Sequence, residues 1–433
     1  MKYIITILLS LLTAARLSAF DLSLAECRSM ALESDESLRI AENNVAGASL
    51  DKSVARTQYL PKLAGSATAL YSAPDSKMGD MMTTQIRGAY MAGITLPQPI
   101  YAGGKITAAN RLAEAGQEIS RQQLRATRMD VIAQAEKSYW TYVAVLAKVD
   151  MTKAYLSLID SVYQMTATSV EVGMANRQAL LRVNTRRSEI VYRLNQALAG
   201  ADICRMALCR IIGVSDTVAI TPTESIADTC DLPLMDFDIS QRPETMILGK
   251  NIYIKHHQLS MTRADFLPTV GLQLGWTAYG NIKMKGWSQD QAGNPIPFTS
   301  TINDNGFMGV LAVQIPLFHW GEGVKKVRKA RLEIENARLA LEQNSRLMQL
   351  EARQYYSNLV TGLQLIHSAD IAMEEADENL RMMREQYEVG LNTLTDLLEA
   401  QSQWQSSYSN LIEARTQYRI SHIDYLRAIG ALE

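Results

Sequence analysis

The chain has 433 residues, of which 43 are Lys or Arg and 45 are Asp or Glu. This balance argues against a nucleic-acid-binding protein, because such proteins concentrate basic side chains on one face. With 47% apolar and 20% charged residues the chain should fold rather than stay disordered. The low numbers of the helix-breaking residues Pro (11) and Gly (24) favour a helical fold.

The first predicted element is an export signal, residues 1–19. Lys2 precedes a largely apolar run of 13 residues from Tyr3 to Ala15, and Ala19 is a small residue suited to the position before a cleavage site. The run is shorter than the about 20 residues of a membrane-spanning helix. No later stretch has 18 consecutive apolar residues. A mature chain that enters a membrane would therefore do so on β-strands.

The rest of the sequence is an internal duplication in which matching segments lie 217 residues apart. A separation held over more than 100 residues is hard to obtain by chance, so we infer two copies of one structural unit. Four pairs of segments carry the match: Pro99–Tyr101 with Pro316–Phe318, Ala135 and Tyr139 with Ala352 and Tyr356, Val170–Gly173 with Tyr387–Gly390, and Arg210–Gly213 with Arg427–Gly430.

Each copy is predicted to contain a helix, two strands, a long helix and a returning helix. The first long helix runs from after Gly104 to about Glu171 without a proline, about 100 Å at 1.5 Å per residue. Its apolar residues recur in alternating steps of four and three, as does the equivalent set in the second copy, and this heptad pattern is typical of coiled coils. The stripe is interrupted at Lys153 and Asp370, which lie either at a solvated edge or in cross-helix ion pairs.

Turn signals follow both long helices. Gly173 and Gly390 are suited to end them, because glycine readily adopts the left-handed conformation found there. Asn176 and Thr393 are suitable N-caps for the returning helices. Residues 214–240 form a polar connector between the copies.

The segments before the long helices alternate apolar with small or polar residues, as strands with one apolar face do. The clearest runs are Val270–Trp276, Phe307–Ile315 and Tyr90–Leu96. About 10 residues per strand suit a tilted crossing of a bilayer, and Trp276 and Tyr279 near the distal ends suit its boundary. The alternative is a soluble hairpin packed on a helix.

Four strands cannot close a barrel, and a lipid-exposed sheet edge is not viable. Three chains would supply 12 strands and arrange the long helices as a tube. The predicted fold is mainly α with a transmembrane β part: a duplicated helix–hairpin–helix whose trimeric α-helical barrel is continuous with a 12-stranded outer-membrane β-barrel. The predicted segments are the helical barrel (20–60, 104–213, 241–265 and 320–433), the strand hairpins (61–103 and 266–319) and the equatorial connector (214–240).

Together, these features resemble the TolC-type outer-membrane efflux protein family over essentially the whole mature chain. The most specific match is the turn segment Gly390–Ala400, GLNTLTDLLEA. The resemblance implies a homotrimer in the outer membrane of a Gram-negative bacterium, in contact with its lipid and extending into the periplasm. It further implies a passive duct without enzymatic activity or cofactor, whose tip docks a periplasmic adaptor protein and, through it, an inner-membrane transporter.

The resemblance also implies site residues. Asp396 and Glu399 match the family's aperture acids, and three residues apart they share one helix face. In a trimer they would surround the constriction with six carboxylates, which attract cations and raise some of one another's pKa values; alone, such a pair is usually solvated. The implied docking tip comprises Val172, Gly173, Val389, Gly390 and Leu391.

The chain departs from the family where some members hold the closed tip with an arginine and an aspartate. Those positions are Asn392 and Ala179 here. Either other contacts hold the gate, for which Tyr387 is a candidate, or the gate is looser. Arg182, the first-copy counterpart of Glu399, is either a partner for a tip carboxylate or solvated.

No catalytic motif or metal-ligand spacing occurs, and the adjacent His256 and His257 would face different sides of a helix. Cys204 and Cys209 are too far apart on a helix for a disulfide. Cys27 and Cys209 are a candidate pair in an oxidising periplasm, while the state of Cys230 stays open.

The sequence leaves three functions open and does not identify the cargo. The favoured one is the exit duct of a tripartite efflux system. The same architecture would serve as the outlet of a type I protein secretion system. A non-conducting periplasmic coiled-coil scaffold or adaptor fits less well, because adaptors usually carry one helical hairpin and a lipoyl-like domain rather than a duplication with bilayer-length strands.

Overall fold

The structure is a computed structural model that describes residues 20–432 except 74, 79–81, 228–231 and 292. The expected export signal, with its cleavage site, and Cys230 lie outside the described residues. Backbone contacts divide the chain into two compact units. The helical unit comprises the described residues up to 44, 121–247 and 341–432, and the sheet unit comprises 45–120 and 248–340.

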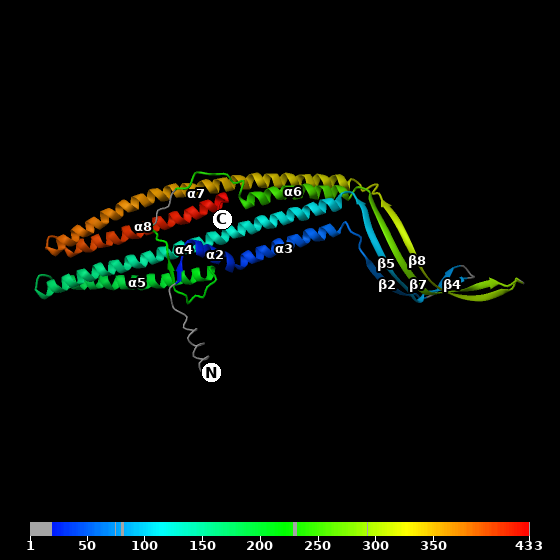
Figure 1. Cartoon of the computed structure of the whole chain (residues 1–433), viewed down its shortest axis with the longest axis horizontal. Helices are drawn as coiled ribbons and strands as arrows, with labels where there is room; N and C mark the ends of the chain where they lie inside the picture. The colour runs from blue at the N-terminus through cyan, green and yellow to red at the C-terminus, as the bar shows by residue number, and fades with distance from the viewer. Residues whose placement is uncertain (1–19, 74, 79–81, 228–231, 292, 433) are drawn as a thin grey trace, which may run out of the picture. The chain divides into compact units, whose positions relative to one another are not determined.

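The helices are α2 (Leu24–Ser34), α3 (Glu36–Thr57), α4 (Lys105–Glu171), α5 (Arg177–Ile211), α6 (Pro243–Ala264), α7 (Glu322–Glu388) and α8 (Leu394–Ile429), shown in Figure 1. The first copy's α3, α4 and α5 repeat as α6, α7 and α8, whereas α2 has no helical counterpart in the described part of the second copy. The long helices α4 and α7 have 67 residues each and begin 217 positions apart. The predicted duplication is therefore confirmed at the level of its helices. No helix of the described residues has both the length and the apolar character needed to span a bilayer.

The core of the helical unit lies between α4, α5, α7 and α8. One cluster of buried side chains takes members from all four helices, including Ile159, Val183, Leu380 and Ile412. The predicted heptad positions Ala135, Tyr139, Ala352 and Leu359 are fully buried. The stripe of period 3.5 in the sequence thus corresponds to the packing surface of these helices.

The two interruptions of the stripe have different outcomes. Asp370 on α7 pairs with Arg415 on α8 at 2.8 Å, which is the cross-helix ion pair. Lys153 pairs with Asp150 on its own helix at 3.0 Å, and both side chains are exposed, which is the solvated edge.

The connector between the copies (residues 214–240) packs on a second buried cluster of the same unit, to which it contributes Ile220 and Ile226. Its strand β6 (Ile220–Pro222) pairs in parallel with β1 (Phe20–Leu22). The hydroxyl of Tyr139 donates to the Leu22 carbonyl at 3.1 Å, and that of Tyr142 donates to the Ile220 carbonyl at 3.0 Å. Buried tyrosines of α4 therefore hold both strands of the β1–β6 pair.

The candidate disulfide between Cys27 and Cys209 is wrong in this structure. Both residues are buried in one cluster, yet both are free thiols, as is Cys204. The Cys27 Sγ lies 3.9 Å from the Ala135 carbonyl on α4 and donates to it. Burial raises the pKa of the Cys27 thiol to about 12, so the thiolate that disulfide exchange requires is scarce.

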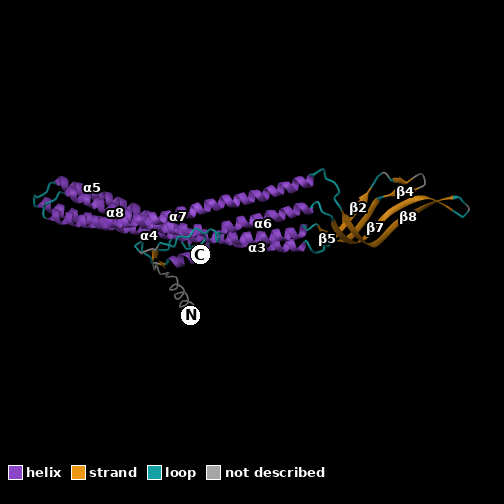
Figure 2. Ribbon diagram, turned by 90° about the horizontal axis from the view of Figure 1, so that it is seen from above, coloured by secondary structure: helices purple, strands orange, loops and turns teal. Residues whose placement is uncertain are grey.

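The sheet unit contains an antiparallel sheet of four long strands, seen in Figure 2. Their order is β2 (Ala64–Tyr71), β5 (Arg87–Ala102), β7 (Thr269–Gln289) and β8 (Pro295–Gln314), with short strands β3 (Ser76–Met78) and β4 (Met82–Gln85) added through a β4–β7 pairing. Among the described residues β2 pairs only with β5 and β8 only with β7. Both outer strands therefore present unpaired backbone.

The strands are longer than predicted. β7 has 21 residues and β8 has 20, where the sequence indicated about 10 each. The β7–β8 pairing shifts register between Tyr279 and Ile282 and then continues to Gln289. Apolar alternation fades in this distal part, where Lys283 and Lys285 lie, so the pattern could not reveal it.

Two turn glycines allow a test of the packing. Gly213, after α5, has a φ of +73°, and a Cβ there would lie 2.3 Å from the Ser34 Cβ. Ser34 is fixed because its hydroxyl donates to the Ile211 carbonyl at 3.0 Å. Gly173 has a φ of +77°, and a Cβ added there would meet no other atom within 4 Å.

We expect Gly173→Ala to destabilise the protein by about 1–2 kcal/mol, the cost of the left-handed conformation alone. Gly213→Ala adds a steric clash and should lower the melting temperature further. Thermal unfolding of the two variants in detergent measures the difference. Equal melting temperatures would contradict the steric account.

Candidate functional site

The two turns of the helical unit that join α4 to α5 and α7 to α8 are built alike. Gly173 and Gly390 adopt φ values of +77° and +79°. The amide after each glycine donates to a carbonyl five residues earlier, at 2.8 Å in both turns. This is the Schellman closure of a helix, so the turns predicted at these glycines are confirmed.

The predicted N-caps of the returning helices are also confirmed. Asn176 accepts a hydrogen bond from the Ala179 amide at 3.0 Å. The Thr393 hydroxyl accepts from the Asp396 amide at 3.3 Å, and the Asp396 carboxylate accepts from the Thr393 amide and hydroxyl at 3.1 and 2.7 Å. Of the two returning helices, α8 thus starts with a reciprocal capping box and α5 does not.

The capping box gives Asp396 a local role that its position in the sequence did not suggest. The side-chain and backbone hydrogen bonds from Thr393 lower the pKa of the Asp396 carboxyl below its usual value. Within one chain the carboxylate is therefore ionised and directed at its own helix start. Glu399, one turn later, is exposed and has no such partner in the described part of the chain.

An open groove of about 930 Å³ joins the two turns. Val172, Gly390 and Val389 of the predicted docking tip line it, and Leu391 projects beside it with 77% of its surface exposed. Met174, which the sequence analysis missed, is 86% exposed in the same groove. The tip thus displays apolar side chains that no neighbour within the chain covers.

Tyr387 links the helix pair α7–α8 to the helix pair α4–α5. Its hydroxyl lies 3.2 Å from that of Thr166, a fully buried residue of α4. The contact joins the end of α7 to the end of α4 next to the groove. A role of Tyr387 in closing the tip stays a prediction.

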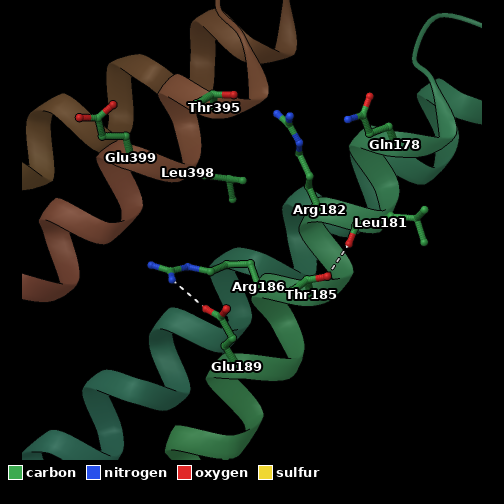
Figure 3. A pocket seen from close by; sticks show the side chains of 9 residues that line it. All are labelled: Gln178, Leu181, Arg182, Thr185, Arg186, Glu189, Thr395, Leu398 and Glu399. Carbon is green, nitrogen blue, oxygen red and sulfur yellow. Dashed lines mark hydrogen bonds and ion pairs between the residues drawn. The ribbon is translucent and has the colours of Figure 1, made fainter.

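A second groove, of about 580 Å³, lies between α5 and α8 and is seen in Figure 3. Arg182 on α5 and Glu399 on α8 stand on opposite walls. Among the described residues Arg182 has neither an ion pair nor a hydrogen bond from its side chain. The pairing alternative for Arg182 is therefore not realised within one chain.

Arg186 is the connecting residue of this groove, a role that was not predicted from the sequence. It donates to the Tyr155 hydroxyl and the Ser402 hydroxyl, both at 3.2 Å, and pairs with Glu189 at 2.9 Å. It thereby joins α4, α5 and α8. The sequence did contain a signal for it: Arg186 lies three residues after Val183, a buried residue, and therefore on the same apolar face of α5, where an arginine needs partners.

The described part of the chain holds no group of three His, Cys, Asp or Glu side chains able to bind a metal ion. What the site offers is an exposed apolar tip next to a groove of mixed charge.

A sequence model of the outer membrane efflux protein family matches residues 27–213 and 255–431. The chain belongs to this family. It is 20% identical over 414 residues to the alkaline protease secretion protein AprF of Pseudomonas aeruginosa, covering 93% of this chain and 83% of that one. It is 22% identical to outer membrane protein OprJ of the same organism, over 95% and 84% of the two chains.

The fold of this chain is similar to the folds of several solved structures. The crystal structure of CusC superposes with a TM-score of 0.79 at 15% identity, over 95% of this chain and 93% of that one. The expected family, the mainly helical fold with an added β part, and the location in the outer membrane with a periplasmic extension are confirmed. Among the solved structures with this fold, OprN and CmeC are outer-membrane channels.

The capping box at Thr393 yields a prediction. Thr393→Ala should lower the free energy of unfolding by about 1 kcal/mol at pH 7, while Thr393→Ser, which keeps the hydroxyl, should not. The pKa of Asp396 is depressed in the folded state, so its contribution is present above the unfolded pKa of about 4 and is lost as pH falls through the folded pKa.

Unfolding of both variants as a function of pH measures this effect. The gap between Thr393→Ala and Thr393→Ser should shrink at acidic pH. A gap that is constant from pH 7 to pH 3 would show that the carboxylate adds nothing to the cap.

Proposed function

We propose that three copies of this chain form an exit duct in the outer membrane that passively conducts substrates delivered by an inner-membrane transporter through a periplasmic adaptor. The observation that carries the proposal is the pair of open sheet edges, β2 and β8. Unpaired backbone groups are not tolerated in the hydrocarbon region of a bilayer, so each edge requires a strand from another chain. All eight residues of β2 are exposed, which leaves room for that strand.

Three chains match the strand count. Small barrels need about 8 strands or more, and three sheets of four long strands supply 12. The family assignment supports the same arrangement, since its members are channels. The stoichiometry is part of the proposal.

The tip supports docking of the adaptor. Val172 and Val389 are 64% and 70% exposed, next to Leu391, and Gly173 and Gly390 keep the backbone of both turns accessible. Isolated exposed apolar residues are ordinary, but a contiguous group at two adjacent turns is typical of an interaction surface. A partner that buries this group would approach along the groove between the turns.

We expect Val389→Asp combined with Leu391→Asp to abolish copurification of the adaptor after in-cell crosslinking at residues 173 and 390. The trimer should persist, because the changes lie on exposed side chains. Glu388→Gln, on the rim of the same groove, is the matched control and should leave capture intact. Undiminished capture by the double variant would exclude this surface as the docking site.

The same crosslinks identify the transporter. An efflux pump among the captured proteins supports the efflux duct. The likeness to AprF, which is named for protease secretion, favours the outlet of a protein secretion system as the second candidate, and capture of a protein-exporting transporter would support it.

The constriction provides an electrical test. Asp396 and Glu399 are the proposed aperture acids, and Glu399 should contribute more because the Asp396 carboxylate is engaged with Thr393. In planar bilayers, Asp396→Asn with Glu399→Gln should lower cation selectivity and the block by multivalent cations, and Glu399→Gln alone should reproduce most of the loss.

Glu189→Gln is the control for that measurement. Glu189 lines the same groove but already pairs with Arg186 at 2.9 Å, so its removal should change selectivity little. Unchanged selectivity and block in the Asp396/Glu399 variant would reject the assignment of the constriction.

A further inference from the structure

Within the sheet unit, the corner between β8 and α7 differs from its counterpart in the first copy. The first copy turns through Gly103 and Gly104, with φ values of +60° and +85°. The equivalent residues are Trp320, at +49°, and Gly321, at +77°. A bulky residue in the left-handed region is strained, and strain of this kind persists where a function requires the side chain.

The chain itself does not compensate that strain by burial. The Trp320 side chain is 86% exposed, and its described ring contact is with Phe318 at 4.8 Å between centroids. An indole exposed to water gains no free energy from burial of its apolar surface. It is more stable at a boundary between apolar and aqueous surroundings, where tryptophan is enriched.

A groove of about 880 Å³ opens beside this corner. Leu317, Phe318 and Val324 form an apolar wall, and all three side chains are largely exposed. The same lining also contains basic side chains, Arg263 on α6 with Arg328 and Arg331 on α7. An apolar wall next to guanidinium groups is the pattern that an amphipathic anion requires.

The three arginines are available to a ligand. None of them has a side-chain hydrogen bond or ion pair among the residues that the structure describes. Two neighbouring lysines are paired with acids, since Lys326 contacts Glu322 at 2.6 Å and Lys105 contacts Asp265 at 2.7 Å. The acids near the groove are therefore already engaged.

The basic character belongs to the second copy alone. Residues 325–331 contain five cations and no acid, whereas the equivalent residues 108–114 contain one of each, Arg111 and Glu114. The two segments are equivalent in the duplication, so the duplication alone does not explain the cluster. The cations and Trp320 both distinguish the second-copy corner from the first-copy corner.

We propose that this groove binds an anionic glycerophospholipid of the adjoining membrane leaflet. The phosphate contacts the guanidinium groups, which match its oxygens with paired N–H donors, and an acyl chain lies against Leu317, Phe318 and Val324. Trp320 stands at the boundary between the two. The inference rests on the proposed function, since it requires the strand ends of the sheet unit to lie at a bilayer.

Competing occupants match the surface less well. Inorganic phosphate would use the arginines and leave the apolar wall in water. A second copy of the chain would have to bring carboxylates to three guanidinium groups. A phospholipid satisfies both halves of the groove.

The test is native mass spectrometry of the detergent-purified full chain with added dioleoyl phosphatidylglycerol or dioleoyl phosphatidylcholine. The wild type should retain phosphatidylglycerol preferentially. Arg328→Gln with Arg331→Gln should reduce that preference by about fivefold per guanidinium. The matched control, Arg111→Gln, changes the repeat-equivalent position of Arg328 and should keep the wild-type preference.

Trp320→Gly separates a lipid contact from a structural role. Glycine relieves the strained φ, so the melting temperature should stay equal or rise while retention of phosphatidylglycerol falls. A lower melting temperature with unchanged lipid retention would show that Trp320 serves the fold, and would overturn its part in the proposal.

The remaining outcomes are distinguishable. Equal retention of both lipids, or a double arginine variant that behaves as the wild type, overturns the lipid site. Crosslinking between copies from an Arg331→Cys variant, with no lipid retained, assigns the groove to a second copy. A chain that fractionates away from the envelope instead contradicts the proposed function itself, which cell fractionation of the same preparations reports.

Discussion

The backbone of the two outer strands governs the rest of this structure. β2 and β8 each have one side without a partner, and an unpaired strand edge costs several kcal/mol per polar group in hydrocarbon. A single chain has no way to remove both edges, because its four long strands are too few to close on themselves. Association is thus a condition of inserting the sheet, and the helices of associated chains must share whatever symmetry the strands adopt.

The duplication gives each chain two similar halves that have diverged at a few positions. The core stripe is kept, with Ala135 and Ala352 both fully buried. The turns are closed alike but capped differently, and the strand-to-helix corner changes from Gly103 to Trp320. Helix packing requires the same buried stripe in both copies. The exposed ends are free of that requirement and can differ to suit the partners that each end binds.

Much of the fold could be predicted from the sequence, because its signals are local. Gly173 and Gly390 mark helix ends, Asn176 and Thr393 mark helix starts, and the heptad spacing identifies the buried faces. The resemblance to the family rested on the duplicated order of these elements and on the turn segment Gly390–Ala400. Such features depend on a few neighbouring residues, so one sequence was sufficient to find them.

Other features depended on three-dimensional contacts. The distal halves of β7 and β8 are held by pairing rather than by apolar alternation. The free state of Cys27 depends on where its sulfur points, towards the Ala135 carbonyl. The capping role of Asp396 and the bridging by Arg186 require the positions of specific hydroxyl groups, which spacing alone does not provide.

Crosslinking of the open edges tests the central claim most directly. Cysteines introduced in pairs, one on β2 at Ala67 and one on β8 at Leu311 or a neighbouring outer residue, should form disulfides between chains in the envelope. The account predicts, for the matching pair, a ladder on denaturing gels that ends at three copies. Monomers alone from every pair in the series, or a ladder that continues past three, would contradict it.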